Sequence, residues 1–107
     1  MDKLPKRFEG FMANYPKIGE AYGNLGDAVA EAGPLDPKSR ALIKIGISVG
    51  AGQGGGTRSQ VRKALQAGAS REEIRHAVLL ATTTIGFPNM MAGLSWVDDV
   101  LESADDE

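Results

Sequence analysis

The glycine-rich segment Ala41–Ala67 constrains the fold of this chain more than any other feature. An apolar run from Ala41 to Val49 enters a cluster of glycines, and a basic, helix-like stretch follows it. The glycines are Gly50, Gly52, Gly54, Gly55 and Gly56. A turn this rich in glycine is where many proteins hold a phosphate, a thiol pair or a metal. The chain has no cysteine and only one histidine, so the usual chemical groups are missing from this turn.

The apolar run permits two interpretations. Isoleucine or valine stands at every second position from Ile43 to Val49, which is the period of a half-buried strand. If the run is a strand, Gly50–Gly55 spells G-x-G-x-x-G before a helix, the pattern of a dinucleotide site. The acidic residue that such a unit needs is missing, and 107 residues are too few for both halves of a dinucleotide fold. The alternative is two helices joined by a glycine hinge.

Length and charge narrow the class of protein. The 107 residues suit one compact domain, which we expect to span residues 1–107. A net charge of -2 gives no electrostatic reason to expect a nucleic acid partner. No stretch reaches the roughly 18 apolar residues that would span a membrane. The absence of cysteine fits a reducing compartment, so we expect a cytoplasmic protein with no membrane partner.

Caps and helix breakers predict an all-α chain of about six helices. A short first helix ends at Pro16, and a second closes near Gly33. Asp36 followed by Pro37 is typical of an N-cap with proline at the first helical position, and predicts a third element from Lys38 to about Val49.

The C-terminal half shows the same kind of punctuation. Residues 58–67 predict a fourth helix, closed by Gly68 in a left-handed conformation. Ser70 with Glu73 is a capping box, and it predicts a fifth helix through about Ile85. Pro88 opens a sixth helix. Its predicted buried stripe consists of Met91, Leu94, Val97 and Leu101.

Two segments carry a family resemblance. LDPKSRALIKIGISVGAG and RKALQAGASREEIRHAVLLATTTIGFPNMMAGL resemble the core of the carboxymuconolactone decarboxylase and alkylhydroperoxidase D-like family. The similarity covers about Leu35 to Val100 and includes A-G-A-S-x-E-E-I and the G-F-P break. Known members are all-helical bundles that assemble as trimers or hexamers. The resemblance therefore implies that residues 41–49 are helical, and that the chain forms a homotrimer or homohexamer.

Redox members of that family carry a Cys-x-x-Cys pair, a histidine four residues later and a glutamate twelve residues upstream. Aligned without gaps, the cysteines fall on Gln53 and Gly56, the histidine on Gln60 and the glutamate on Ala41. All four positions of the motif have therefore lost their redox chemistry. The family's label suggests a peroxidase, but a chain without cysteine cannot form the thiolate that this route requires.

Polar groups remain near the vanished motif. Gln53, Thr57, Arg58 and Gln60 are candidate ligand-binding residues, and the free N–H groups of a helix start could hold a carboxylate or another anion such as phosphate. The alternative is that these residues cap a helix and line a subunit contact.

Catalytic groups are scarce elsewhere. His76 and Lys44 are the candidates for acid–base chemistry, against the simpler interpretations of an interface histidine and an exposed lysine. A lone histidine without cysteine is a poor metal site, so neither a metal nor another cofactor is expected. Two functions stay open at this point. One is a non-redox lactone or small-acid enzyme, or a binding pseudoenzyme on the same scaffold. The other is a structural or regulatory homo-oligomer without activity.

Overall fold

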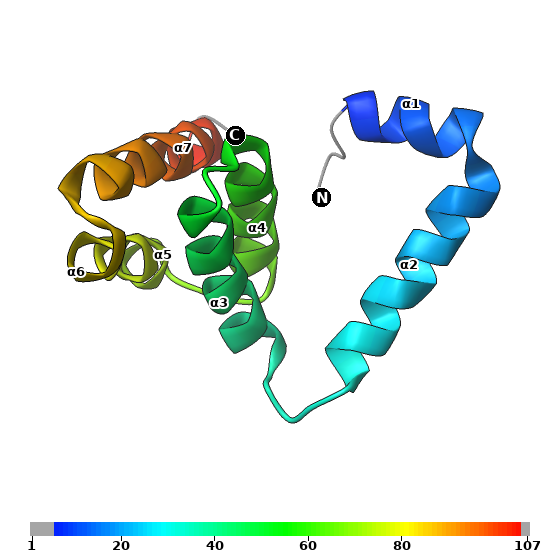
Figure 1. Cartoon of the computed structure of the whole chain (residues 1–107), viewed down its shortest axis with the longest axis horizontal. Coiled ribbons are helices and arrows are strands. Elements are labelled where there is room, and N and C mark those ends of the chain that lie inside the picture. Colours follow the sequence, from blue (N-terminus) through cyan, green and yellow to red (C-terminus); the bar gives the residue numbers. More distant parts are fainter. Residues whose placement is uncertain (1–5, 106–107) are drawn as a thin grey trace. The chain divides into compact units, whose positions relative to one another are not determined.

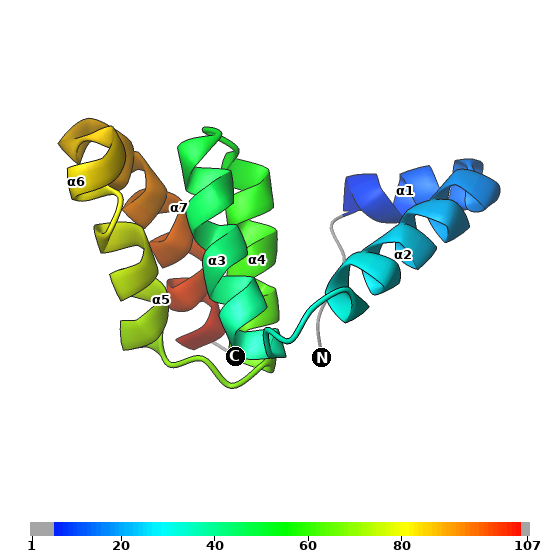
Figure 2. The ribbon, with the colours of Figure 1, turned by 60° about the horizontal axis from the view of Figure 1, so that its bottom comes forward.

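The computed structural model describes residues 6–105, and all regular structure in that range is helical (Figures 1 and 2). Seven helices occur there, one of them a single turn of four residues, which confirms the all-α prediction. Their bounds are α1 Lys6–Asn14, α2 Pro16–Glu31, α3 Pro37–Gly50, α4 Gly54–Gln66, α5 Arg71–Leu79, α6 Thr82–Ile85 and α7 Phe87–Asp105. Over the described residues, none of these helices combines the length and apolar character needed to cross a membrane.

The chain divides into two compact units, Met1–Pro34 and Leu35–Glu107. The first contains α1 and α2. Pro16 stands in the first turn of α2 because a proline there forfeits no helical hydrogen bond. Met12 of α1 covers Gly19 of α2 so closely that a Cβ at Gly19 would have no room. Gly19 is the buried residue of α2, and no large apolar side chain is buried among residues 8–31 of this helix pair.

The second unit has a real core. Helices α3 and α4 lie side by side as a hairpin, and α5 and α7 pack on them (Figures 1 and 2). Aliphatic side chains from all four helices fill the centre. Ile45, Val61, Ile74, Val78, Val97 and Leu101 have no exposed surface there. Burial of this set drives the folding of the second unit, since each such side chain contributes roughly 1.5–3 kcal/mol on transfer from water.

Helix α3 resolves the ambiguity of the apolar run. Ile45 and Val49 are four residues apart and buried, whereas Ile43 and Ile47 are 47% and 65% exposed. A period of 3.6 residues therefore divides the alternating residues between an inner and an outer face. The Asp36 carboxylate caps this helix by accepting from the Ser39 N–H at 2.7 Å, as the sequence predicts.

Helix α4 starts earlier than the sequence predicts. It begins at Gly54 and not at Arg58, so three glycines of the cluster lie in α4 and a fourth, Gly50, ends α3. The turn shrinks to residues 51–53. Gly52 supplies the turn with its positive φ of 71°. A Cβ on Gly54 would lie 3.1 Å from the Trp96 indole, which shows why a residue without a side chain begins this helix. Close packing on α7 thus outweighs the low helix propensity of glycine.

The predicted fifth helix is wrong in its length. It ends at Leu79, and α6 follows as a separate turn. The Thr82 and Thr84 hydroxyls donate to the carbonyls of Leu79 and Leu80, so threonine side chains compete with the backbone where the helix breaks. The capping box of Ser70 and Glu73 and the left-handed Gly68 are confirmed.

The predicted stripe of the last helix is shifted by one residue at its start. Met90 is buried and Met91 is 47% exposed, whereas Val97 and Leu101 are buried as expected. The helix begins at Phe87, directly after Gly86 with its φ of 97°. This break sets the rotation of α7 about its axis. Met90 and Met91 are adjacent and chemically identical, so the sequence alone does not indicate which of them is buried.

Candidate functional site

The start of α4 holds the two positions, Gln53 and Gly56, to which the family resemblance assigns a thiol pair. Gln53 is the N-cap and Gly56 lies in the first turn. A Cβ built on Gly56 would be 3.6 Å from the Cβ of Gln53 and 3.6 Å from that of Ser48. The two positions that the family resemblance assigns to thiols therefore face one another.

Thr57 serves the interior of the protein and not a ligand. Its side chain is fully buried, and its hydroxyl donates to the Gln53 carbonyl at 2.9 Å. The same oxygen lies 2.9 Å from the hydroxyl of Ser48, whose single proton is shared between the Thr57 oxygen and the Ile45 carbonyl, also 2.9 Å away. This hydrogen-bonded pair joins α3 to α4 at the turn, because buried hydroxyls need partners.

Arg58 is also engaged within the fold. Its Nη2 and Nε atoms donate to Asp99 Oδ2 of α7 at 2.8 and 3.3 Å. The predicted cation at the helix start is therefore offset by a carboxylate. Both side chains are partly exposed, so the pair is worth at most about 1 kcal/mol of stability.

The remaining motif positions do not gather in one place. Gln60 lies one turn beyond Gly56 on α4, and its Oε1 atom is buried with no partner in the described part of the chain. Ala41 is buried in the first half of α3, nine residues before the end of that helix. Nine residues correspond to about 13 Å along the axis, so Ala41 lies far from the turn.

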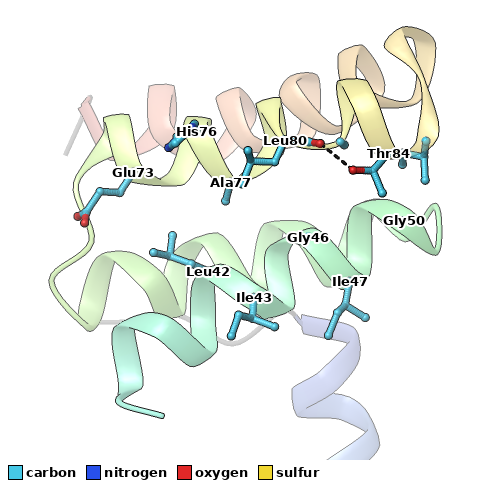
Figure 3. A pocket seen from close by; sticks show the side chains of 12 residues that line it. Leu42, Ile43, Gly46, Ile47, Gly50, Glu73, His76, Ala77, Leu80 and Thr84 are labelled. Atoms are coloured by element: carbon cyan, nitrogen blue, oxygen red, sulfur yellow. Dashed lines mark hydrogen bonds between the residues drawn. The ribbon is translucent and has the colours of Figure 1, made fainter.

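The second unit has a groove along the face of α3 that looks toward α5 and α6. It has a volume of about 590 Å³ and lies between α3 on one side and α5 with α6 on the other (Figure 3). Leu42 and Ala77 point toward one another across it. Gly46 and Gly50 also line it, and a Cβ on either would meet no atom within 4 Å. The lining is completed by Ile43, Ile47, Glu73, His76, Leu80, Ala81, Thr84 and Ile85.

Three residues of this groove have polar side chains, and two of these side chains are hydrogen-bonded within the second unit. The Thr84 hydroxyl donates to the Leu80 carbonyl at 2.9 Å. The Glu73 carboxylate accepts from the Ser70 N–H at 2.9 Å and from Lys38 Nζ at 3.0 Å. The Ser70 N–H, followed by Lys38, lowers the pKa of Glu73, so this carboxylate stays ionised near neutral pH.

His76 is the polar group of the groove that remains available. It is exposed on α5, and its imidazole makes no hydrogen bond within residues 6–105. An imidazole can donate or accept a proton, so it can contact a carboxylate or a carbonyl. The structure thus places one of the two predicted acid–base candidates at a concave site.

The other candidate has no such setting. Lys44 is exposed on α3 and does not line the groove. No group of three possible metal ligands occurs among the described residues.

Comparison with known proteins agrees with this architecture. A family model described as "Carboxymuconolactone decarboxylase family" matches residues 16–99. The chain belongs to the carboxymuconolactone decarboxylase family. No curated protein matches it significantly. Within this family the chain is a member without cysteine.

Sequence reasoning missed the groove of this family member. Its two walls are separated by more than twenty residues, and only the tertiary fold brings α3 to α5. One signal was present: Gly46 and Gly50, like Ile43 and Ile47, are four residues apart, which places them along one side of a helix.

Proposed function

We propose that this chain is a non-redox member of its family that binds a small, mostly apolar carboxylic acid or lactone in the groove between α3 and α5–α6. The observation that carries the proposal is His76, whose imidazole lines a mostly apolar groove and makes no hydrogen bond within residues 6–105. The volume of about 590 Å³ falls within the range of small-molecule sites. Lys38 offsets the negative charge of Glu73, which favours an acidic ligand beside His76.

The same site suits decarboxylation, the reaction in the family's name. Loss of CO₂ breaks the bond between the ligand carbon and its carboxylate, and leaves the electron pair on that carbon or on a conjugated oxygen. One proton must then reach the ligand. His76 is the residue that we assign to this proton transfer, as a general acid. No thiol takes part in such a step, so the absence of cysteine is compatible with it.

The test uses 5-oxo-2,5-dihydrofuran-2-carboxylate, a γ-lactone whose C=C bond conjugates the carboxylate-bearing carbon with the lactone carbonyl, so that the electron pair left by CO₂ has an acceptor. Calorimetry follows its binding. Gly46→Leu fills the groove and should weaken binding at least tenfold. His76→Gln should weaken this acid as well, but should leave the neutral γ-butyrolactone unaffected. Gly46→Ala and Lys44→Gln are matched controls, because the first adds one methyl group to open space and the second lies off the groove.

Equal binding by wild type and Gly46→Leu would contradict the groove as the site. Release of CO₂ by wild type, and its loss in His76→Gln at an acid concentration that saturates the variant, would support the catalytic assignment. Binding without CO₂ release would favour a binding pseudoenzyme.

A second candidate is a structural or regulatory homo-oligomer without activity. It is supported by large apolar side chains on the surface of the second unit. Ile47, Leu80 and Phe87 are 65%, 59% and 59% exposed, which is costly unless a partner covers them. The family resemblance suggests a trimer or a hexamer, and light scattering at micromolar concentration decides between these and a single chain. We further propose that residues 1–107 act as one domain, since the family match crosses the boundary between the two units.

A further inference from the structure

The two ends of the groove between α3 and α5–α6 differ in chemistry (Figure 3). Its lining belongs entirely to the second unit. The titratable side chains of the lining, Glu73 and His76, lie at one end, and Thr84 lies toward the other end, where α3 finishes at Gly50. A groove divided in this way suits a ligand with one polar and one apolar part, because each part then meets its own kind of surface.

At the Thr84 end, the polar groups beside the break between α5 and α6 are already hydrogen-bonded. The Thr84 hydroxyl donates to the Leu80 carbonyl at 2.9 Å, and the Ala81 carbonyl accepts from the Ile85 N–H at 2.8 Å. The side chains of Leu80, Ala81 and Ile85 are aliphatic. A polar ligand group placed there would lose water without gaining a partner, so this end favours a hydrocarbon.

On the α3 side, the groove follows a strip of bare backbone. Gly46 and Gly50 are one turn apart, and a Cβ on either would meet no atom within 4 Å. Ile43 and Ile47 form the adjacent row of the same helix, and both are exposed. The strip runs from Leu42 to Gly50, which corresponds to about 12 Å along the helix axis. An aliphatic chain of that length would cover both isoleucines.

The His76 end favours a carboxylate over an ammonium group. Both oxygens of the Glu73 carboxylate are hydrogen-bonded, Oε1 to the Ser70 N–H at 2.9 Å and Oε2 to Lys38 Nζ at 3.0 Å. Lys38 thus offsets the charge that would attract a cationic ligand. The imidazole of His76 makes no hydrogen bond within residues 6–105, and its N–H can donate to a carboxylate.

Building on the function proposed above, we propose that the ligand of this groove is a linear aliphatic carboxylic acid. Its carboxylate lies beside His76, and its hydrocarbon tail runs along α3 toward Gly50. Gly50 then limits the length of tail that the groove accepts, because the strip ends there. Decanoate, whose extended chain is about as long as the strip, is the expected best fit.

Calorimetry with straight-chain acids from butyrate to tetradecanoate tests the tail in the wild-type protein, at concentrations below micelle formation. Each added methylene group should strengthen binding by up to about fourfold as far as decanoate, because it removes more apolar surface from water. Longer acids should gain nothing further, since their tails extend past the groove. Decylamine should bind roughly tenfold more weakly than decanoate, because it cannot accept from the imidazole N–H.

A variant tests the direction of the tail. Gly50→Leu fills the far end of the groove, so it should weaken decanoate roughly tenfold and leave butyrate unchanged. Gly55→Leu is the matched control, because Gly55 lies on α4 outside the groove and a Cβ there also meets no atom within 4 Å. It should bind the whole series as wild type does. Equal weakening of butyrate and decanoate by Gly50→Leu would overturn the orientation, since the carboxylate would then lie near Gly50.

The series also separates the linear acid from the function on which it rests. If 5-oxo-2,5-dihydrofuran-2-carboxylate binds but affinity does not rise from butyrate to decanoate, the linear acid is wrong and the proposed function stands. If decylamine binds as tightly as decanoate, His76 does not select a carboxylate and the assignment is wrong. If neither the lactone acid nor any straight-chain acid binds, both proposals are overturned.

Discussion

The guanidinium of Arg58 on α4 is held by the carboxylate of Asp99 on α7, with Nη2 and Oδ2 2.8 Å apart. The cation that the sequence offers to an anion at the start of α4 is therefore neutralised from a helix forty residues further along the chain. This contact is one reason why we propose the ligand in the groove beside His76 and not at the glycine turn.

Removal of the Asp99 carboxylate should uncover an anion site at the start of α4. In Asp99→Asn the Arg58 side chain gains freedom to bind sulfate, beside the first N–H groups of the helix. We expect sulfate to raise the melting temperature more in this variant than in wild type. Without sulfate the variant should lose no more than about 1 kcal/mol of unfolding free energy, because the ion pair is partly exposed.

The matched control for this prediction is Asp98→Asn, because Asp98 also lies on α7. This variant breaks the ion pair between Asp98 Oδ1 and Arg75 Nε of α5, which are 3.2 Å apart. It should show the sulfate response of wild type. An identical response of the two variants would mean that Arg58 has no special role at the helix start.

Two helix caps should make stability depend on pH in the acid range. The Ser39 backbone N–H lowers the pKa of Asp36, and the Ser70 backbone N–H lowers that of Glu73. A lowered pKa in the folded state means that the unfolded chain binds protons more readily. The contribution of the two caps to stability therefore rises with pH in this window. It is complete above the unfolded pKa values of about 4, and it is lost as pH falls through the lower folded values.

The double variant Asp36→Asn with Glu73→Gln should flatten this dependence of the melting temperature. Glu20→Gln with Asp27→Asn is the control, since these two exposed carboxylates of α2 make no hydrogen bond in the described chain. A cap variant whose melting temperature falls as steeply as that of the control would show that the caps do not set acid stability.

Gly93 of α7 should not tolerate even one added methyl group. A Cβ there would lie 2.8 Å from Cγ1 of Val49 and 3.1 Å from Cγ1 of Val78, both of which are buried. Gly93→Ala should therefore cost about 1–3 kcal/mol of unfolding free energy in urea titration, although alanine favours the helix. Gly46→Ala on α3 is the control and should gain up to about 1 kcal/mol.

A rescue experiment separates crowding from other effects at this position. Val49→Ala combined with Gly93→Ala removes the methyl groups that the new Cβ meets, so the two costs should be less than additive. Strict additivity would argue that Gly93 is required for a reason other than its contact with Val49.

The features that the sequence predicts well are those that nearby residues determine. The caps at Asp36 and Ser70 depend on hydrogen bonds within three residues, and both form as expected. The start of α4 could not be predicted in the same way. Whether Gly54 is helical depends on the Trp96 indole packed against it from α7, and no local pattern reports that contact.

The candidate site shows the same division more sharply. His76 could be named as a possible proton carrier because it is the chain's single histidine. Its setting could not be named, because the groove exists only when the fold brings Leu42 of α3 opposite Ala77 of α5. The period-two pattern of the apolar run also concealed that Gly46 lines an open side of its helix.

Cysteines restored at Gln53 and Gly56 should form a disulfide. The 3.6 Å between the Cβ of Gln53 and a Cβ built on Gly56 lies within the range that disulfides require. A thiol at a helix start also ionises more easily, which favours its oxidation. Free-thiol titration of Gln53→Cys with Gly56→Cys after mild oxidation should therefore find almost no free thiol.

The control is Gln53→Cys with Gly55→Cys. A Cβ built on Gly55 has no atom within 4 Å, so it lies farther from the Cβ of Gln53 than a Cβ on Gly56 does. It should retain both thiols. Peroxidase activity is expected in neither variant, since Gln60 supplies no base and Ala41 no carboxylate. If the Gln53 and Gly56 pair stays reduced while the helical circular dichroism of wild type is kept, the vanished redox motif did not occupy this turn.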